Sequence, residues 1–206
     1  MTPPEKAPTG KMSDMAARLY VVSGPSGVGK STIAHAILDK FKDSIVYSIS
    51  MTTRHIREGE LDGREYIFTT VAEFEKLIAE GAFIEHAKVH DNYYGTLRSQ
   101  IESALAKGIN VLLDIDTKGA QNIKKNYHDA VLIFIAPPSI EELRQRLLKR
   151  HTDSVEVIEK RIHNAIQEIE MSSTYDYIVK NIDLEQAVGE CEGIIEDHMN
   201  NVSARA

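Results

Sequence analysis

Apolar residues occur along this chain in short runs that alternate with stretches of helical spacing. Four runs are short and rich in β-branched residues, as strands are: Leu19–Ser23, 111–115, Val131–Ala136 and Tyr177–Lys180. The second and third runs are almost continuously apolar, which is typical of strands buried on both faces of a parallel sheet. Helices are predicted between the strands, so the pattern indicates an α/β fold with a mostly parallel sheet.

Capping residues mark where several helices begin. Thr70 with Glu73, and Ser139 with Glu142, follow the Ser/Thr-x-x-Glu pattern of a capping box. Thr96 is also expected to cap a helix, because apolar residues recur after it at helical spacing. Further helices are predicted after the first strand, over residues 155–171 and from about residue 184.

The composition is that of an ordinary globular domain. The chain has 206 residues, a mass of 23.0 kDa and 42% hydrophobic residues, which suits one folded domain and excludes an intrinsically disordered chain. Acidic residues outnumber basic ones by 31 to 24, so the formal net charge is −7. Binding to nucleic acid or to an anionic membrane rewards a basic excess, so we expect neither as a partner.

The N-terminus and the cysteine content refine this picture. Three prolines lie among the first eight residues, so residues 1–17 are predicted to form a flexible tail ahead of a domain over 18–206. No apolar run approaches the ~18 residues of a membrane span. Cys191 is the single cysteine, so no intrachain disulfide can form, and we expect a reducing, cytoplasmic compartment.

A glycine-rich segment carries the strongest chemical signal. Residues 24–31 read Gly-Pro-Ser-Gly-Val-Gly-Lys-Ser, the full G-x-x-x-x-G-K-[ST] pattern of a phosphate-binding loop, between a predicted strand and a predicted helix. Its glycines let backbone N–H groups converge on phosphate oxygens, and the helix directs its positive end at the same anion. Lys30 is expected to reach the transferable phosphates and Ser31 to hold magnesium. The segment predicts a nucleoside triphosphate site.

A second basic segment follows the loop in sequence. Arg54 and Arg57 are three residues apart, with Tyr66 nearby, and could clamp a second phosphate group. Taken alone, the segment fits a charged surface loop equally well.

Five separated motifs follow one another along the chain: SGPSGVGKST, SxTTRxxRxGExDGxxYxF, FIEHAxVHxNYYGT, LLDID and IAPPS. In this order they resemble the guanylate kinases, a family of P-loop nucleoside monophosphate kinases, over nearly all of residues 18–200. The resemblance implies transfer of the γ-phosphoryl group of ATP to GMP, giving ADP and GDP, with dGMP as a second expected substrate. It also implies Mg²⁺ as the metal, and ATP and GMP as small-molecule partners.

The resemblance implies a division of the chain as well. The P-loop kinase core, a parallel sheet flanked by helices, would comprise residues 18–49 and 97–206. A small GMP-binding lobe would comprise about 50–96, and a mobile lid about 141–165. The sequence carries no signal for an oligomeric state.

Eight positions match residues with which guanylate kinases bind GMP: Ser50, Arg54, Arg57, Tyr66, Glu85, Tyr94, Thr96 and Asp116. The two arginines and the two tyrosines would hold the GMP phosphate and damp its repulsion toward the incoming γ-phosphate. The other four would read guanine. The carboxylate of Glu85 suits the adjacent N1–H and N2–H₂ donors of guanine, whereas adenine presents an acceptor at N1.

The ATP and metal sites are implied in the same way. ATP would be bound by Gly24, Pro25, Ser26, Gly27, Val28, Gly29, Lys30, Ser31, Thr32 and Asn181. Ser31 would bind magnesium directly, and Asp114 would do so through water. Asp114 follows a buried apolar run, at the carboxyl end of a strand, where ligands of open α/β sheets collect.

Four residues are implied in catalysis: Lys30, Arg54, Arg150 and Arg161. The last two lie in the predicted lid, whose closure would bring both cations onto the transferring phosphoryl group and exclude water. The neighbouring Arg144 and Arg146 are expected to be surface residues.

Two alternatives remain. The first is a non-catalytic interaction module of guanylate-kinase-like fold, but such modules lose phosphate-loop residues, and Gly29, Lys30 and Ser31 are intact here. The second is a kinase for another small phosphorylated acceptor, against which Ser50, Glu85 and Tyr94 together argue.

Overall fold

The computed structural model describes residues 17–89, 91–149 and 154–203, and its core is a five-stranded sheet. The strands are β1 (Leu19–Ser23), β2 (Ile45–Tyr47), β7 (Asn110–Asp114), β8 (Val131–Ala136) and β9 (Tyr177–Lys180). Their order is β2-β7-β1-β8-β9, and every neighbouring pair is parallel. The predicted α/β fold with a parallel sheet is therefore confirmed.

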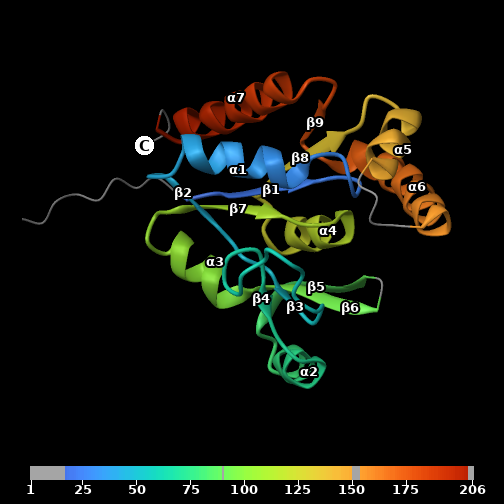
Figure 1. Cartoon of the computed structure of the whole chain (residues 1–206). Helices are drawn as coiled ribbons and strands as arrows, with labels where there is room; N and C mark the ends of the chain where they lie inside the picture. Colours follow the sequence, from blue (N-terminus) through green and yellow to red (C-terminus); the bar gives the residue numbers. More distant parts are fainter. Residues whose placement is uncertain (1–16, 90, 150–153, 204–206) are drawn as a thin grey trace, which may run out of the picture.

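Helices cover both faces of this sheet (Figure 1). The helices on one face are α1 (Lys30–Lys40) and α7 (Leu184–Ser203), and those on the other are α3 (Arg98–Leu105) and α4 (Thr117–Asn126). Each face has its own apolar core, because successive side chains of a strand point to opposite faces. In β1, Tyr20 and Val22 belong to the first core and Val21 to the second.

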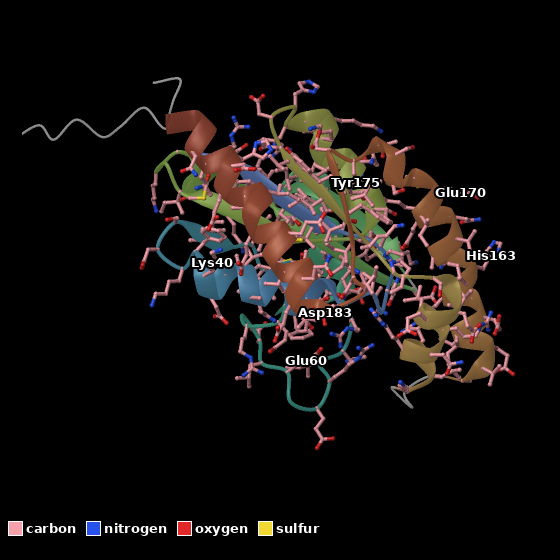
Figure 2. The ribbon with its side chains drawn as sticks, turned by 90° about the horizontal axis from the view of Figure 1, so that it is seen from above. Lys40, Glu60, His163, Glu170, Tyr175 and Asp183 are labelled. Atoms are coloured by element: carbon pink, nitrogen blue, oxygen red, sulfur yellow. The ribbon has the colours of Figure 1, made fainter. Side chains whose placement is uncertain are left out.

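Helix α7 lies along α1 (Figure 2). Lys40, at the end of α1, pairs with Glu192 and Glu196 of α7 at 2.8 and 2.9 Å. None of the helices in the described ranges is long and apolar enough to cross a membrane.

A second sheet lies on the side of α3 and α4 (Figure 1). Its strands are β3 (Met51–Thr52), β4 (Ile67–Phe68), β5 (Phe83–Val89) and β6 (Asn92–Leu97), in the order β4-β3-β6-β5, and α2 (Val71–Ala79) packs on it. The rings of Phe74 and Phe83 stack 4.3 Å apart between α2 and β5. This sheet did not emerge from the hydrophobic pattern, because its strands are short or mix apolar with polar residues.

Helices α5 (Ile140–Leu148) and α6 (Val155–Glu170) pack against each other through a small apolar cluster of their own. They project from the carboxyl ends of β8 and β9 (Figure 1). A short 3₁₀ turn, η1 (Met171–Thr174), leads from α6 to β9.

The capping predictions are confirmed at two helices and wrong at a third. The side chains of Thr70 and Ser139 accept hydrogen bonds from the backbone N–H of Glu73 and Glu142 at the starts of α2 and α5. Thr96 caps no helix. It lies in β6 opposite Glu85, and α3 begins only at Arg98, with Leu97 as its N-cap residue.

Candidate active site

The phosphate loop joins β1 to α1 and takes a conformation that only glycine permits at three positions. Gly24, Gly27 and Gly29 have φ angles of 139°, 89° and 104°. A Cβ atom on Gly24 would lie 2.3 Å from the carbonyl oxygen of Ile135 in β8. The loop therefore packs closely against the end of the sheet. Helix α1 begins at Lys30, directly after Gly29, and its positive end lies at the loop.

Lys30 lies within the curve of this loop. Its ammonium group donates to the carbonyl oxygens of Gly24 at 2.9 Å and Pro25 at 3.3 Å. A cation held there is poised beside any phosphate that the loop N–H groups bind.

Two oxygen ligands suited to magnesium meet at the same end of the sheet. The hydroxyl of Ser31, in the first turn of α1, donates to Oδ2 of Asp114 at 2.7 Å. Asp114 is the last residue of β7, which is hydrogen-bonded to β1. A hydroxyl beside a carboxylate is the hard-oxygen donor set that Mg²⁺ prefers, so these residues fit the metal that the sequence implied.

A cavity of about 300 Å³ opens beside the phosphate loop. It is lined by Gly27, Val28, Gly29, Thr32, Arg146, Asn181, Ile182 and Leu184. Asn181 is buried, and its side-chain amide donates to the carbonyl oxygen of Val28 at 2.7 Å. Asn181 thus joins the end of β9 to the loop.

Arg146 is a residue of this cavity that the sequence analysis placed on the surface. Its guanidinium donates to the carbonyl oxygen of Asn181 at 3.0 Å and pairs with Glu142 at 3.4 Å. The sequence signal was the Glu142–Arg146 spacing of four residues, which is equally typical of an exposed pair on a helix. Arg144 instead joins the two helices of the α5–α6 pair through Glu159.

The second basic segment forms a loop between β3 and β4. Arg54 makes a two-point ion pair with Glu60, at 2.8 and 3.0 Å, and lies over the ring of Tyr66 at 5.3 Å. The Tyr66 and Tyr94 rings meet edge to face, 5.9 Å apart. The side chain of Arg57 is exposed. Arg54, Tyr66 and Tyr94 therefore come together, as the motif implied, and Glu60 joins them.

Glu85 is a buried carboxylate on the second sheet. Its Oε1 accepts a hydrogen bond from the hydroxyl of Thr96 on the adjacent strand at 2.7 Å, and the residue is only 7% exposed. Burial raises its pKa to about 7, and the charge of Asp116 adds to the rise, while the Thr96 hydrogen bond opposes it. A ligand that donates hydrogen bonds to this carboxyl group would stabilise its charged form.

Asp116 has a bond within the protein that competes with its implied role. Its Oδ1 accepts from the backbone N–H of Gly119 at 2.7 Å, which makes it the N-cap of α4. Gly119 in turn lies against Glu85, because a Cβ atom there would lie 2.7 Å from Oε2 of Glu85. A direct contact of Asp116 with guanine stays a prediction.

Three further implied residues have less defined surroundings. Ser50 precedes β3, and its carbonyl oxygen accepts from the N–H of Ile67 at 3.0 Å. Arg161 lies half-buried on α6. Arg150 lies outside the described residues.

Charges on the core sheet and α1 affect residues of the second sheet and of α6. The pKa of Tyr66, on the second sheet, is raised by burial and then by the charge of Asp114 on the core sheet. The pKa of Glu168, on α6, is raised by burial and lowered in part by the charge of Lys30. Glu168 was not singled out from the sequence, where it is one of several acidic residues on a polar helix. Charges of Asp114 and Lys30, at the carboxyl end of the core sheet, thus act on residues of the second sheet and of α6.

Known proteins share this sequence and fold. Residues 16–198 match the guanylate kinase family. The guanylate kinase of Mycoplasma pneumoniae is 45% identical over 184 residues, which cover 89% of this chain and 77% of the relative. The guanylate kinase of Clostridium perfringens strain 13 is 49% identical over 177 residues, covering 86% and 82%.

A solved structure agrees with these relatives. The crystal structure of guanylate kinase from Anaplasma phagocytophilum matches with a TM-score of 0.75 and 35% identity, covering 90% of this chain and 88% of that chain. The matches extend over both sheets and the intervening helices, and the phosphate-loop residues are complete. This chain therefore belongs to the guanylate kinase family.

Proposed function

We propose that this protein transfers the γ-phosphoryl group of ATP to GMP, giving ADP and GDP, with dGMP as a second acceptor. Besides the family, the observation that supports this acceptor is Glu85, a carboxyl group buried against Thr96. A buried carboxylate needs donors, and guanine supplies N1–H and N2–H₂ side by side. Adenine would leave it facing the N1 acceptor.

The reaction needs no nucleophile from the protein. An oxygen of the GMP phosphate attacks the γ-phosphorus of ATP, and the bond from that phosphorus to the bridging oxygen of ADP breaks. Lys30 and the phosphate-loop N–H groups bind the ATP phosphates, while Arg54, Arg57, Tyr66 and Tyr94 orient the GMP phosphate. Catalysis then rests on alignment and charge stabilisation.

The remaining site assignments are part of the same proposal. Ser31 and Asp114 would hold Mg²⁺, which neutralises charge on the β- and γ-phosphates when it is bound. The cavity beside Arg146 and Asn181 would take the base of ATP. Arg161, and Arg150 outside the described residues, would act from the lid over residues 141–165.

We further propose that the partners are small nucleotides alone and that the protein works in the cytoplasm. The net charge of −7 disfavours a nucleic-acid surface. The single cysteine, Cys191, is buried, and burial raises its pKa to about 12, so it is an unreactive thiol suited to a reducing compartment.

A coupled ADP-release assay with GMP, dGMP, AMP, UMP and dTMP as acceptors tests the function. We expect turnover with GMP and dGMP only. Turnover with AMP alone would establish a different acceptor, and no turnover with any of the five would favour an interaction module.

Replacing the phosphate-loop lysine tests the catalytic assignment. Lys30→Ala should leave a folded protein whose kcat falls by about 100-fold or more, because charge stabilisation at the transferring group is lost. Lys42→Ala, which removes an exposed lysine just after α1, is the matched control and should keep its activity. A wild-type kcat in Lys30→Ala would refute the role of the loop.

A further inference from the structure

The guanidinium of Arg54 is held on two of its edges by the protein itself. Nη1 and Nη2 donate to Oε2 and Oε1 of Glu60 at 3.0 and 2.8 Å, so the outer end of the group is occupied. Nη1 also donates to the carbonyl oxygen of His55 at 2.7 Å. A guanidinium has five N–H donors, and these bonds use three of them.

The two remaining donors lie together on the third edge. They are the Nε–H and the second hydrogen of Nη2, which point in the same direction and form a fork of their own. Among the described residues, no hydrogen bond uses the Nε–H of Arg54. A fork of this kind matches two oxygens of one phosphate group.

We propose that Glu60 is a positioning residue for GMP binding, which holds Arg54 by its outer edge so that its Nε–Nη2 edge faces the GMP phosphate. The proposal rests on the proposed function. It gives Glu60 a role that the motif did not assign: Glu60 and the phosphate bind different edges of Arg54 at the same time, and they do not compete.

The surroundings of Glu60 make it a rigid support. Its Oε2 also accepts from the backbone N–H of Arg57 at 2.8 Å, and the backbone N–H of Glu60 donates to the carbonyl oxygen of Arg57 at 3.1 Å. Gly59, with φ of 83°, allows this tight turn. The turn therefore ties the backbone of Arg57 to the side chain of Arg54.

Aromatic rings lie against the planar guanidinium of Arg54. The guanidinium of Arg54 lies over the rings of Tyr66 at 5.3 Å and Phe68 at 5.6 Å. Only 11% of the Arg54 side chain and 18% of the Glu60 side chain are exposed. Figure 2 labels Glu60 on the loop between β3 and β4.

If the charge of Glu60 alone mattered, its removal would change GMP binding in the opposite direction from that expected for a positioning residue. Glu60 is an anion near the site of a phosphate dianion, so its removal would tighten GMP binding if only long-range repulsion mattered. If its role is to orient Arg54, removal weakens GMP binding. The sign of the change in GMP affinity therefore distinguishes the two effects.

The test compares Glu60→Gln with wild type. Glutamine keeps the size of the side chain but presents an NH₂ group to one nitrogen of Arg54, so the two-point pair is lost. We expect the Kd for GMP, measured by calorimetry without ATP, and the KM for GMP to rise about tenfold. The KM for ATP should change less than about twofold, because the phosphate loop belongs to the core sheet and, among the described residues, no hydrogen bond or ion pair joins it to Glu60.

The matched control is Glu65→Gln. Glu65 is an acid of the same loop, paired with Arg64 at 2.5 Å, and neither residue is part of the site. Glu65→Gln should leave the Kd for GMP unchanged. Glu60→Asp keeps the charge but shortens the reach, so it should lie between wild type and Glu60→Gln, and it provides the same comparison if Glu60→Gln fails to fold.

A double variant separates positioning from general support of the loop. Lysine cannot form the two-point pair, so Glu60→Gln should cause little further loss in an Arg54→Lys background. An equal loss in both backgrounds, or an unchanged or lower Kd for GMP in Glu60→Gln, would overturn the proposal. Failure of wild type to phosphorylate GMP would instead overturn the proposed function.

Discussion

Burial of Glu85 destabilises its charged form in the protein without ligand. Its pKa rises from 4.5 to about 7, mainly through loss of water, so the folded protein takes up a proton between these values. The cost of keeping the group charged is absent below pH 4.5 and fully present above about pH 7. In the proposed complex the N–H donors of guanine would offset this cost, and so would contribute to selectivity for GMP.

This pKa predicts how activity depends on pH. The kcat/KM for GMP should fall as pH drops below about 7, because the free enzyme then protonates the acceptor that guanine needs. In the GMP complex the donors favour the carboxylate, so the fall in kcat should move to lower pH. Rate profiles between about pH 5 and 9 provide the measurement.

A glutamine variant is the control for this profile. The GMP phosphate itself titrates near pH 6 and contributes a fall of its own. Glu85→Gln should lose the contribution near pH 7 and keep that of the phosphate. A profile identical to wild type would show that Glu85 does not titrate in this range.

At the scale of elements, α4 is placed by its contact with the second sheet. Asp116 caps its N-terminus, and Gly119, in its first turn, packs against the carboxylate of Glu85 from β5. A glycine inside a helix costs roughly 0.5–1 kcal/mol relative to alanine. Gly119 therefore lowers the stability of the helix but leaves room for the carboxylate of Glu85.

Gly119→Ala should separate these two effects. The added Cβ would lie 2.7 Å from Oε2 of Glu85, so the carboxylate must shift. We expect the KM for GMP to rise about tenfold or more, as misplacement of a ligating group does, with the KM for ATP unchanged. Thermal unfolding should show no loss as large as a core cavity causes.

The α7 glycine Gly189 is the matched control. A Cβ atom at Gly189 would contact nothing within 4 Å. Gly189→Ala should therefore stabilise the helix by about 0.5–1 kcal/mol and leave both KM values unchanged. If Gly119→Ala behaves in the same way, the contact with Glu85 has no part in GMP binding.

For the whole molecule, net charge and local charge have different consequences. The chain carries −7 overall, yet Lys30, Arg54 and Arg57 belong to the site proposed to bind two anionic nucleotides. An acidic exterior gives little long-range attraction for such ligands, so capture depends on short-range contacts and on magnesium.

The ionic-strength dependence of kcat/KM for GMP tests this. We expect a change of less than about threefold between about 0.02 and 0.2 M salt at fixed Mg²⁺, because such contacts are only weakly screened. A steep fall with salt would show that steering dominates and that the distribution of surface charge matters more than its sum.

Much of the fold and part of the site followed from local sequence rules. Four of the five strands of the core sheet were predicted from their apolar runs, but the three-residue β2 was not, and the helix starts at Thr70 and Ser139 follow from capping alone. Thr96 was misassigned because a threonine ahead of a helical pattern resembles an N-cap, whereas pairing with β5 keeps it in a strand. The proposed guanine site therefore depends on a strand pair that local propensity did not predict.

By itself, the sequence determined the phosphate loop, four strands of the core sheet with the helices between them, and the resemblance to the family. These depend on backbone conformation and on neighbours a few residues away. Only the tertiary structure decided that Ser31 meets Asp114, that Arg146 meets Asn181 and that Gly119 lies against Glu85. Those pairs join separate elements, and their distances are set by sheet order and helix packing, which no local pattern specifies.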